Sequence, residues 1–130
     1  MIVQRQTRQK QVILGALPAL NHPTATTVYE EIHRTNPTIS RATVFRVLKQ
    51  AEENGVILRL SFAGGEDRFD FNVKPHYHVR CKFCGKVSDV TMPVLEGLEE
   101  RVEDACGYIV QSHDVEFKGV CPECREKYMK

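Results

Sequence analysis

The stretch Pro75–Asp89, PHYHVRCKFCGKVSD, concentrates side chains of the kinds that bind metals in proteins. Its candidate ligands are His76, His78, Cys81, Cys84 and Asp89. If His76 and His78 lie on a strand, both rings point to the same side, because side chains alternate along an extended chain. The stretch therefore predicts that nitrogen, oxygen and sulfur ligands gather in one small part of the fold.

Two Cys-x-x-Cys pairs, Cys81 with Cys84 and Cys121 with Cys124, predict a structural zinc site. Each pair directs two sulfur atoms toward one point, and two well-separated pairs are typical of tetrahedral Zn²⁺. The alternatives are a rubredoxin-like iron site and two separate redox dithiols. Zinc suits a small domain, because metal binding can supply roughly 10 kcal/mol or more of folding free energy.

His76, His78 and Asp89 form a second kind of ligand set. Because four thiolates fill the coordination positions of zinc, these imidazoles and this carboxylate remain for a second, harder metal ion. Two surface histidines are the alternative interpretation of the His-x-His pattern. We expect the function of the protein to depend on this second site.

The composition is that of an ordinary globular protein, with 42% hydrophobic and 27% charged residues in a chain of 130. This length fits one domain or two small ones. The chain has no long apolar run and no evident secretory signal, so we expect no membrane span and a cytoplasmic location. Five cysteines, four of them in pairs, favour a reducing compartment, and the odd Cys106 is predicted to be buried.

The charge is unevenly distributed along the chain. Residues 1–49 hold seven Lys or Arg and two Glu, a balance of +5, whereas residues 75–130 hold eight basic and ten acidic residues, a balance of −2. A basic first half fits a polyanionic partner such as DNA, although it is equally compatible with a solvated surface.

Hydrophobic spacing predicts three helices in this basic half. Thr7 is expected to cap the first helix and Pro18 to end or kink it. Thr24 begins the second helix, which ends near residues 36–37, and Ser40 caps the third. The buried stripe of the third helix is expected to be Val44, Val47, Leu48 and Ala51.

The outer face of the third helix is small near its start and cationic further along. It carries Ala42, Thr43, Phe45, Arg46 and Lys49. Arginine can bind guanine or phosphate, and an aromatic ring can contact a thymine methyl group, as in recognition helices. A solvated amphipathic helix is the alternative, but the basic surroundings favour DNA binding.

Glycines separate two predicted strands after the third helix. Residues 56–62 and 68–71 flank Gly64-Gly65 and are typical of a β-hairpin. Three helices and a hairpin predict a winged helix-turn-helix domain over residues 1–74.

The remaining residues, 75–130, predict a small α/β domain, so that the whole chain is α+β or α/β. Residues 87–90 form a strand, and Pro93 starts a helix that Gly107 ends. The buried side of this helix is expected to be Leu95, Leu98 and Val102. Residues 108–120 alternate like a strand, with His113, Val115 and Phe117 on one face. Sheet and helix are expected to form a two-fold dimer.

These motifs together resemble the ferric uptake regulator family over nearly the whole chain. The matching stretches are HPTA at 22–25, SRATVFRVL at 40–48, PHYHVRCKFCGK at 75–86 and the closing CPEC. The resemblance implies a homodimeric, metal-dependent repressor that binds a palindromic, AT-rich double-stranded DNA operator. It also implies structural Zn²⁺ on the four paired cysteines and a regulatory metal between the two domains.

Matched position by position, the family's regulatory ligands fall on five residues. They are His22, Asp70, His76, His78 and Asp89. Three imidazoles and two carboxylates suit Fe²⁺ or Mn²⁺. A metal bound by both domains would lock their relative orientation and so select a DNA-binding dimer. Without the resemblance, His22 is better explained as a helix-entry cap or a surface histidine than as a metal ligand.

Aspartate at both carboxylate positions resembles the peroxide-sensing branch of the family. There Fe²⁺ reacts with hydrogen peroxide, and the radical formed oxidises a ligand histidine, here His22 or His76. Iron sensors of the family often have an additional site, of which Glu96 and His113 match two ligands. Pro75 and Tyr77 replace the others, so we expect that site to be absent and His113 to be structural.

Two DNA-binding positions depart from the family pattern. Phe45 replaces the usual tyrosine, which removes a hydroxyl contact to DNA but keeps the contact to a thymine methyl group. Arg5 is only loosely aligned with a basic residue that the family inserts into the minor groove.

Other classes of protein stay open as alternatives. An iron, manganese or zinc uptake regulator shares this scaffold with a peroxide sensor. An enzyme with His76, His78 and Asp89 as a catalytic metal site lacks an HExxH motif and a spare general base. A simple zinc-ribbon module leaves His22 and Asp70 unexplained.

Overall fold

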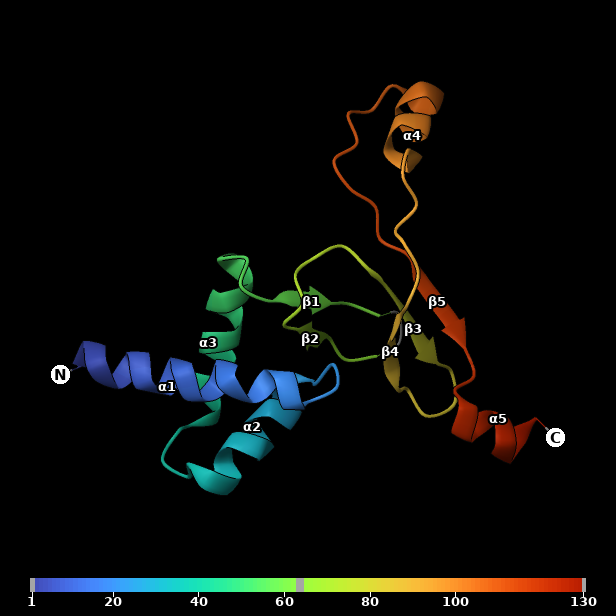
Figure 1. Ribbon diagram of the computed structural model, residues 1–130. Helices are drawn as coiled ribbons and strands as arrows, with labels where there is room; N and C mark the ends of the chain where they lie inside the picture. Colours follow the sequence, from blue (N-terminus) through green and yellow to red (C-terminus); the bar gives the residue numbers. More distant parts are fainter. Residues whose placement is uncertain (1, 63–64, 130) are drawn as a thin grey trace. The chain divides into compact units, whose positions relative to one another are not determined.

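The computed structural model describes residues 2–62 and 65–129, with side chains from Thr7 onward. The chain divides into two compact units, Met1–Lys74 and Pro75–Lys130. Each unit combines helices with its own sheet, so the predicted mixed α and β fold is confirmed (Figure 1). None of the helices in the described residues is long and apolar enough to cross a membrane.

The first unit consists of three helices, a short 3-10 turn and a two-stranded antiparallel sheet. The elements are α1 (Ile2–Ala16), η1 (Leu17–Ala19), α2 (Ala25–Thr35), α3 (Arg41–Glu53), β1 (Leu58–Leu60) and β2 (Arg68–Asp70). This is the order of elements in a winged helix-turn-helix. Both strands lie where the sequence predicts them and are shorter; the predicted glycine turn includes Gly64, which lies outside the described residues.

Local capping explains where α2 and α3 begin. The Thr24 side chain accepts a hydrogen bond from the N–H of Thr27, and that of Ser40 accepts one from Thr43, both at 3.1 Å. These two predicted caps are confirmed. The predicted cap at Thr7 is wrong, because α1 already begins at Ile2 and no proline or glycine interrupts the sequence between them. α1 ends at Ala16, directly before the turn that contains Pro18.

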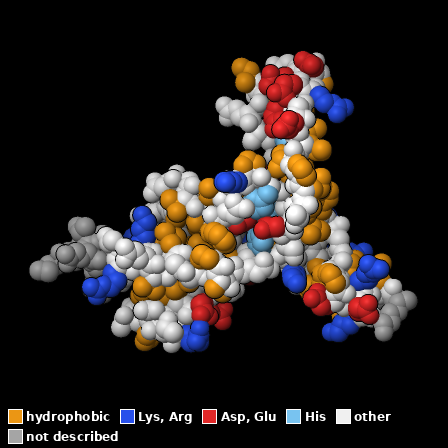
Figure 2. All heavy atoms as spheres, in the orientation of Figure 1, with side chains coloured by type: hydrophobic (Ala, Val, Ile, Leu, Met, Phe, Trp, Pro, Cys, Tyr) orange, Lys and Arg blue, Asp and Glu red, His pale blue; other side chains and the backbone are white. Residues whose placement is uncertain are grey.

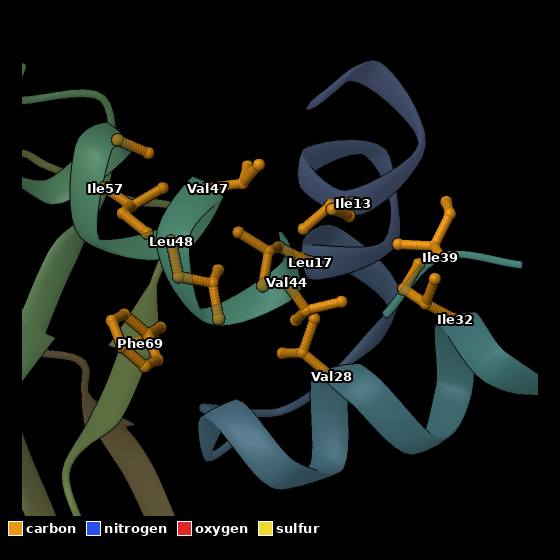
Figure 3. Packing of buried hydrophobic residues seen from close by; sticks show 11 residues of the cluster. Ile13, Leu17, Val28, Ile32, Ile39, Val44, Val47, Leu48, Ile57 and Phe69 are labelled. Carbon is orange, nitrogen blue, oxygen red and sulfur yellow. The ribbon is translucent and has the colours of Figure 1, made fainter. Parts of the chain in front are cut away.

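The three helices of the first unit enclose a continuous apolar core (Figure 3). The predicted stripe of α3 is fully buried, and it meets residues from α1 and α2 and Phe69 from β2. The buried members are Ile13, Leu17, Val28, Ile32, Ile39, Val44, Val47, Leu48, Ala51, Ile57 and Phe69. Packing of the helices thus fixes the outer face of α3 at the surface.

The second unit is built on a three-stranded sheet in the order β4-β3-β5. Its elements are β3 (Tyr77–Cys81), β4 (Val87–Val90), α4 (Leu98–Cys106), β5 (Glu116–Gly119) and α5 (Pro122–Tyr128). The central strand β3 pairs antiparallel with β4 and parallel with β5. β4 has the predicted bounds, whereas α5, which begins directly after Cys121 and contains Cys124, was not predicted.

The predicted helix from Pro93 starts five residues later, at Leu98. Gly97 precedes it in a left-handed conformation that breaks a helical path, and the N–H of Leu95 donates to the Tyr77 hydroxyl at 2.8 Å. The predicted buried side is also wrong, since no residue of α4 is buried and the side chains of Leu95 and Val102 are exposed. The predicted end at Gly107 is confirmed by its left-handed cap.

The predicted strand over residues 108–120 is reduced to β5. Alternating apolar and polar residues form a half-buried strand only where a neighbouring strand is available for pairing. Residues 108–115 have no such neighbour among the described residues, and Tyr108 and Ile109 remain 73% and 89% exposed. Cys106 is exposed rather than buried, because α4 packs none of its residues into the core of its unit; its Sγ donates to the carbonyl of Val102 at 3.1 Å.

Candidate metal centres and nucleic-acid interface

A tight turn after β3 brings the first cysteine pair together. Cys81 is the last residue of the strand, and Cys84 lies in the turn that follows. Gly85 closes the turn with a φ of 78°, which residues with a Cβ rarely adopt, and its N–H donates to the carbonyl of Cys81 at 2.9 Å. The N–H of Cys81 donates to the carbonyl of Lys86 at 2.9 Å, so both ends of the turn are fixed.

The parallel strand β5 brings the second pair to the same end of the sheet. Gly119 pairs with Cys81, and its carbonyl accepts from the N–H of Lys82 at 2.8 Å. Cys121 follows as the residue that precedes α5, and Cys124 is buried in the first turn of this helix. Neighbouring strands thereby bring together residues that lie 40 positions apart in the sequence.

The four sulfur atoms have the spacing of a tetrahedral zinc site. One ligand atom from each cysteine lies within 4.8 Å of the other three, and the Sγ atoms of Cys84 and Cys121 are 3.7 Å apart. Zinc–sulfur bonds of about 2.3 Å in a tetrahedron place sulfur atoms about 3.8 Å apart. All four cysteines are free thiols. The cluster therefore fits a metal ion.

The thiols of this cluster differ in acidity. Backbone N–H groups, first that of Cys121 and then those of Cys84 and Phe83, lower the pKa of the Cys81 thiol to about 6. Burial and then the neighbouring sulfur atoms raise the pKa of the Cys124 thiol to about 12. Cys81 therefore loses its proton more readily than Cys124, and a bound cation favours the thiolate form of both.

His22 and Asp70 form a buried pair in the first unit. His22 Nε2 lies 3.5 Å from Asp70 Oδ2, and both side chains are less than a tenth exposed. Asp70 Oδ1 accepts from the N–H of Asn72 at 2.9 Å, which leaves the other oxygen on the side of His22. His22 has a φ of 46°, a left-handed conformation that is uncommon for a residue with a Cβ and is often found at functional sites.

Neighbouring side chains hold His22 in one orientation. Its Nδ1 donates to Asn21 Oδ1 at 2.8 Å, so the lone pair resides on Nε2, the atom that faces Asp70. β2 secures the loop, since Arg68 donates to the carbonyl of His22 at 3.0 Å and the N–H of Phe69 to that of Pro23 at 2.9 Å. The sequence analysis missed Asn21 and Arg68, for which the only signal is that they neighbour His22 and Asp70 in sequence.

His76, His78 and Asp89 form a second set in the other unit. The Nε2 atoms of His76 and His78 lie 3.1 and 3.3 Å from the same oxygen of Asp89, and the ring centroids are 4.4 Å apart. The strand register causes this convergence, because His78 on β3 pairs directly with Asp89 on β4. Both rings thus point the same way, as the His-x-His spacing predicts.

Both sets fit the donor chemistry of a divalent ion. Nitrogen and oxygen ligands about 2.1 Å from an ion and at right angles to each other lie about 3 Å apart, close to the separations in each unit. The structure groups the five predicted ligands as two in the first unit and three in the second.

The outer face of α3 is accessible to a partner. Ala42, Arg46 and Lys49 are exposed, Thr43 is half-buried, and Phe45 is 38% exposed. The side chain of Arg5, the remaining predicted DNA contact, lies outside the described residues.

A hydrogen-bonded chain in the second unit involves Glu99, where the family resemblance pointed to Glu96. The Tyr77 hydroxyl, which accepts from the N–H of Leu95, contacts His113 Nε2 at 2.8 Å, and His113 Nδ1 contacts Glu99 Oε1 at 2.6 Å. The bond from His113 holds the pKa of Glu99 below its usual value of 4.5. His113 thus joins β3 to α4 through its two ring nitrogens.

The first unit has the order of elements of a winged helix-turn-helix, and the second gathers side chains that can bind metal ions. This combination is typical of metal-binding transcriptional regulators. Residues 3–118 match the sequence model of the ferric uptake regulator family. A peroxide-responsive repressor, PerR, from Staphylococcus epidermidis is 36% identical over 95% of this chain and 83% of its own length.

Two solved structures are also similar. The Campylobacter jejuni peroxide stress regulator has a TM-score of 0.78 at 27% identity, with 93% of this chain and 92% of that chain covered. A zinc-bound manganese uptake regulator has a TM-score of 0.66 at 30% identity, with 87% of each chain covered. The chain belongs to the ferric uptake regulator family and is a metal-dependent repressor of that family.

Proposed function

We propose that the protein is a cytoplasmic, homodimeric repressor that releases its DNA operator when hydrogen peroxide oxidises a ligand histidine. Residues 1–74 are the DNA-binding domain and residues 75–130 the dimerisation and metal-binding domain. The observation that carries the proposal is the pair of histidine–aspartate sets, His22 with Asp70 and His76 and His78 with Asp89. The protein acts as a regulator, without catalytic turnover.

Structural Zn²⁺ is bound by Cys81, Cys84, Cys121 and Cys124. The sulfur spacing and the low pKa of the Cys81 thiol support this assignment. The ion joins the ends of β3 and β5 to the start of α5 and so stabilises the second unit.

The regulatory ion is Fe²⁺ or Mn²⁺ and takes ligands from both units. Neutral imidazoles and carboxylates suit these ions better than thiolates do. Because the first unit supplies two ligands and the second three, one ion completes its coordination only by holding the units in a single relative orientation. Metal binding then selects the dimer that fits DNA, because the ion binds this arrangement more tightly than the others.

α3 is the helix that enters the major groove. Its exposed Arg46 and Lys49 supply positive charge, and Phe45 supplies an aromatic edge for a thymine methyl group. Two such helices related by a dimer axis fit a palindromic, AT-rich operator whose half-sites are about one helical turn apart. Arg5 is proposed to contact the minor groove.

Uncovered apolar side chains support the homodimer. α4 buries none of its residues, and Leu95, Val102, Tyr108 and Ile109 are between 46% and 89% exposed. Figure 2 shows acidic side chains gathered over α4, with hydrophobic side chains along the segments that lead to and from this helix. An apolar surface of this kind, flanked by charge, is typical of a protein–protein interface.

Peroxide sensing depends on the histidines. Fe²⁺ held by these residues would supply the one-electron chemistry that breaks the O–O bond of hydrogen peroxide beside the ligand rings. Over the whole reaction the iron would return to Fe²⁺, because the imidazole supplies both electrons that reduce the peroxide. The imidazole of His22 or His76 gains one oxygen atom, and the second oxygen of the peroxide leaves as water. An oxidised ring is a poorer ligand, so the two units lose their common ion and the dimer releases DNA. The four cysteines take no part, because zinc occupies their sulfur atoms.

Mass spectrometry on protein loaded with Fe²⁺ without oxygen tests the proposal. Samples taken before and after a brief, low dose of peroxide are analysed as intact protein and as peptides, and the same samples are tested for DNA binding. One added oxygen on His22 or His76, together with loss of binding, is the expected result. Protein loaded with Mn²⁺ is the control; its mass should not change, and it should remain bound to DNA.

The Asp89→Glu variant sharpens this test. It keeps a carboxylate for the metal and should bind DNA with Fe²⁺ or Mn²⁺ but resist peroxide. The same oxidation in this variant as in the wild type would contradict the role assigned to aspartate.

A metal uptake regulator is the second candidate. It is favoured by the similarity to a manganese uptake regulator and by a ligand set that also accepts Mn²⁺ or Zn²⁺. DNA binding that requires metal but survives peroxide without histidine oxidation would support this candidate over the peroxide sensor.

A further inference from the structure

Arg41 makes contacts that the proposed function leaves unexplained. It is the first residue of α3, and its side chain is exposed. Residues four positions apart share one side of a helix, so Arg41 lies on the same side as Phe45, the residue assigned to a thymine methyl group. The structure therefore places an arginine beside the aromatic group that is expected to distinguish bases.

Three contacts hold the guanidinium of Arg41. Its Cζ atom lies 4.7 Å from the centroid of the Phe45 ring and 5.8 Å from that of Tyr29. Its Nη2 donates to Thr26 Oγ1 at 2.9 Å. Both ring distances lie within the range of attractive cation–π contacts. Arg41 thus joins the first turn of α2 to the exposed ring on α3.

This arrangement links the exposed ring to the interior of the first unit. Tyr29 is half-buried and packs against the apolar core, and its hydroxyl contacts His33 Nδ1 at 3.4 Å. Phe45 is 38% exposed, so packing against the core alone does not restrict its ring. A planar guanidinium held by a hydrogen bond and a second ring supplies the missing restriction.

We propose that Arg41 is a positioning residue that fixes the Phe45 ring for contact with a thymine methyl group. It thereby determines the preference of the repressor for thymine at one step of its operator. The proposal rests on the proposed function, because it requires α3 to lie in the major groove. A direct contact between Arg41 and a phosphate is the competing role, and it would carry no preference for thymine.

The test compares thymine with deoxyuridine, which lacks only the methyl group. Mn²⁺-loaded full-length wild type first selects its operator from a random DNA pool. Each thymine is then replaced in turn, and the replacement at the Phe45 contact should weaken binding about fourfold, the value of one buried carbon. Selection of no sequence would overturn the proposed function itself, whereas a selected operator without any methyl effect would overturn the role of Arg41 alone.

Arg41→Gln and the matched Arg34→Gln complete the test. Both remove one positive charge from the first unit, and Arg34 pairs with Glu31 on the exposed side of α2. In Arg41→Gln the fourfold preference for thymine should disappear, whereas Arg34→Gln should keep it. Equal weakening on both DNAs by Arg41→Gln, with a smaller salt dependence and an unchanged preference, would establish a phosphate contact and overturn the proposal.

Arg41→Lys separates positioning from charge and keeps the test decisive if Arg41→Gln fails to fold. Lysine preserves the charge but not the planar fork that stacks on Phe45 and bonds to Thr26. Its affinity for deoxyuridine DNA should stay near that of the wild type while its preference for thymine falls. A full preference for thymine in this variant would contradict a positioning role.

Discussion

The first unit is stabilised by apolar packing, whereas the second depends on a few specialised contacts. Eleven buried side chains from the helices, the hairpin and the segments between them form the core of the first unit. In the described part of the second unit, the buried apolar residues are Tyr77, Cys81, Val87 and Cys124, two of which belong to the four-cysteine cluster. The first unit is therefore stabilised by its own apolar core, whereas the second, in our proposal, needs a bound metal ion and a second copy of the chain.

This difference suits the two roles of a metal-dependent repressor. A helix that inserts into DNA must keep its shape, and α3 buries its full inner stripe in the larger core. A unit that senses a metal ion must change its conformation when the ion is lost. In our proposal, the stability of the second unit therefore depends mainly on the residues that bind metal. The predictions that follow separate the two kinds of stability.

The largest expected effect is that of Cys124→Ser. This change removes a buried thiol of the proposed zinc site, and zinc binding contributes roughly 10 kcal/mol or more in small thiolate sites. We expect loss of bound zinc and of hydrogen-exchange protection throughout residues 75–130, with the protection of α1, α2 and α3 retained. Metal analysis and hydrogen-exchange mass spectrometry on the same samples measure both.

Cys106→Ser is the matched control for this variant. Cys106 is exposed on α4 and is not one of the four clustered thiols, so this variant should keep its zinc. A folded second unit in zinc-free Cys124→Ser would show that apolar packing alone suffices there.

Leu48→Ala tests the apolar core of the first unit. Leu48 is 1% exposed, and removing its side chain leaves a cavity that costs about 2–5 kcal/mol. Hydrogen exchange should accelerate throughout α1, α2 and α3, while the zinc content of the second unit stays unchanged. Val56→Ala, at a position that is 48% exposed, is the control and should change the exchange little. An equal effect of both variants would contradict the assignment of the core.

The two units also differ in how far the sequence predicts them. In the first unit, caps at Thr24 and Ser40 and the buried stripe of α3 act within a few residues, so local pattern suffices. In the second, the alternating residues 108–115 form no strand, because alternation does not reveal whether a neighbouring strand is present. α4 starts late because the left-handed Gly97 and the bond from Leu95 to Tyr77 depend on tertiary structure.

The candidate metal ligands also differ in how far the sequence predicts them. Spacing alone predicts the cysteine pairs as ligands and makes candidates of His76 and His78, because the members of each set lie close together in sequence. His22 and Asp70 are 48 positions apart, and only the resemblance to a family linked them before the structure brought them together. The left-handed backbone of His22 and the hydrogen bond from His22 to Asn21 leave no signal in the composition or periodicity of the sequence.

Tyr77→Phe tests a smaller contact within the second unit. The variant keeps the buried ring but leaves the N–H of Leu95 and a nitrogen of His113 without the hydroxyl, which costs about 1–3 kcal/mol. Exchange should accelerate in α4 and in the segment before it, at full zinc occupancy. Tyr128→Phe, at a position that is 59% exposed, is the matched control. Equal protection in both variants would mean that the hydroxyl bonds add no stability.

The smallest expected effect concerns pH. The hydrogen bond from His113 lowers the pKa of Glu99 below its usual 4.5, so the folded chain binds this proton less readily than the unfolded chain. The resulting stability is fully present above pH 4.5 and is lost as the pH falls through the lowered pKa. Glu99→Gln should therefore flatten the acid side of the stability profile of the second unit, whereas Glu96→Gln, an exposed carboxylate nearby, should leave it unchanged. Hydrogen exchange of α4 across this pH range, compared only among samples with full zinc content, measures the profile. Identical slopes for the wild type and Glu99→Gln would show that the bond from His113 to Glu99 adds no stability that depends on the charge of Glu99. The contrast between the units would then rest on zinc and the exposed apolar side chains alone.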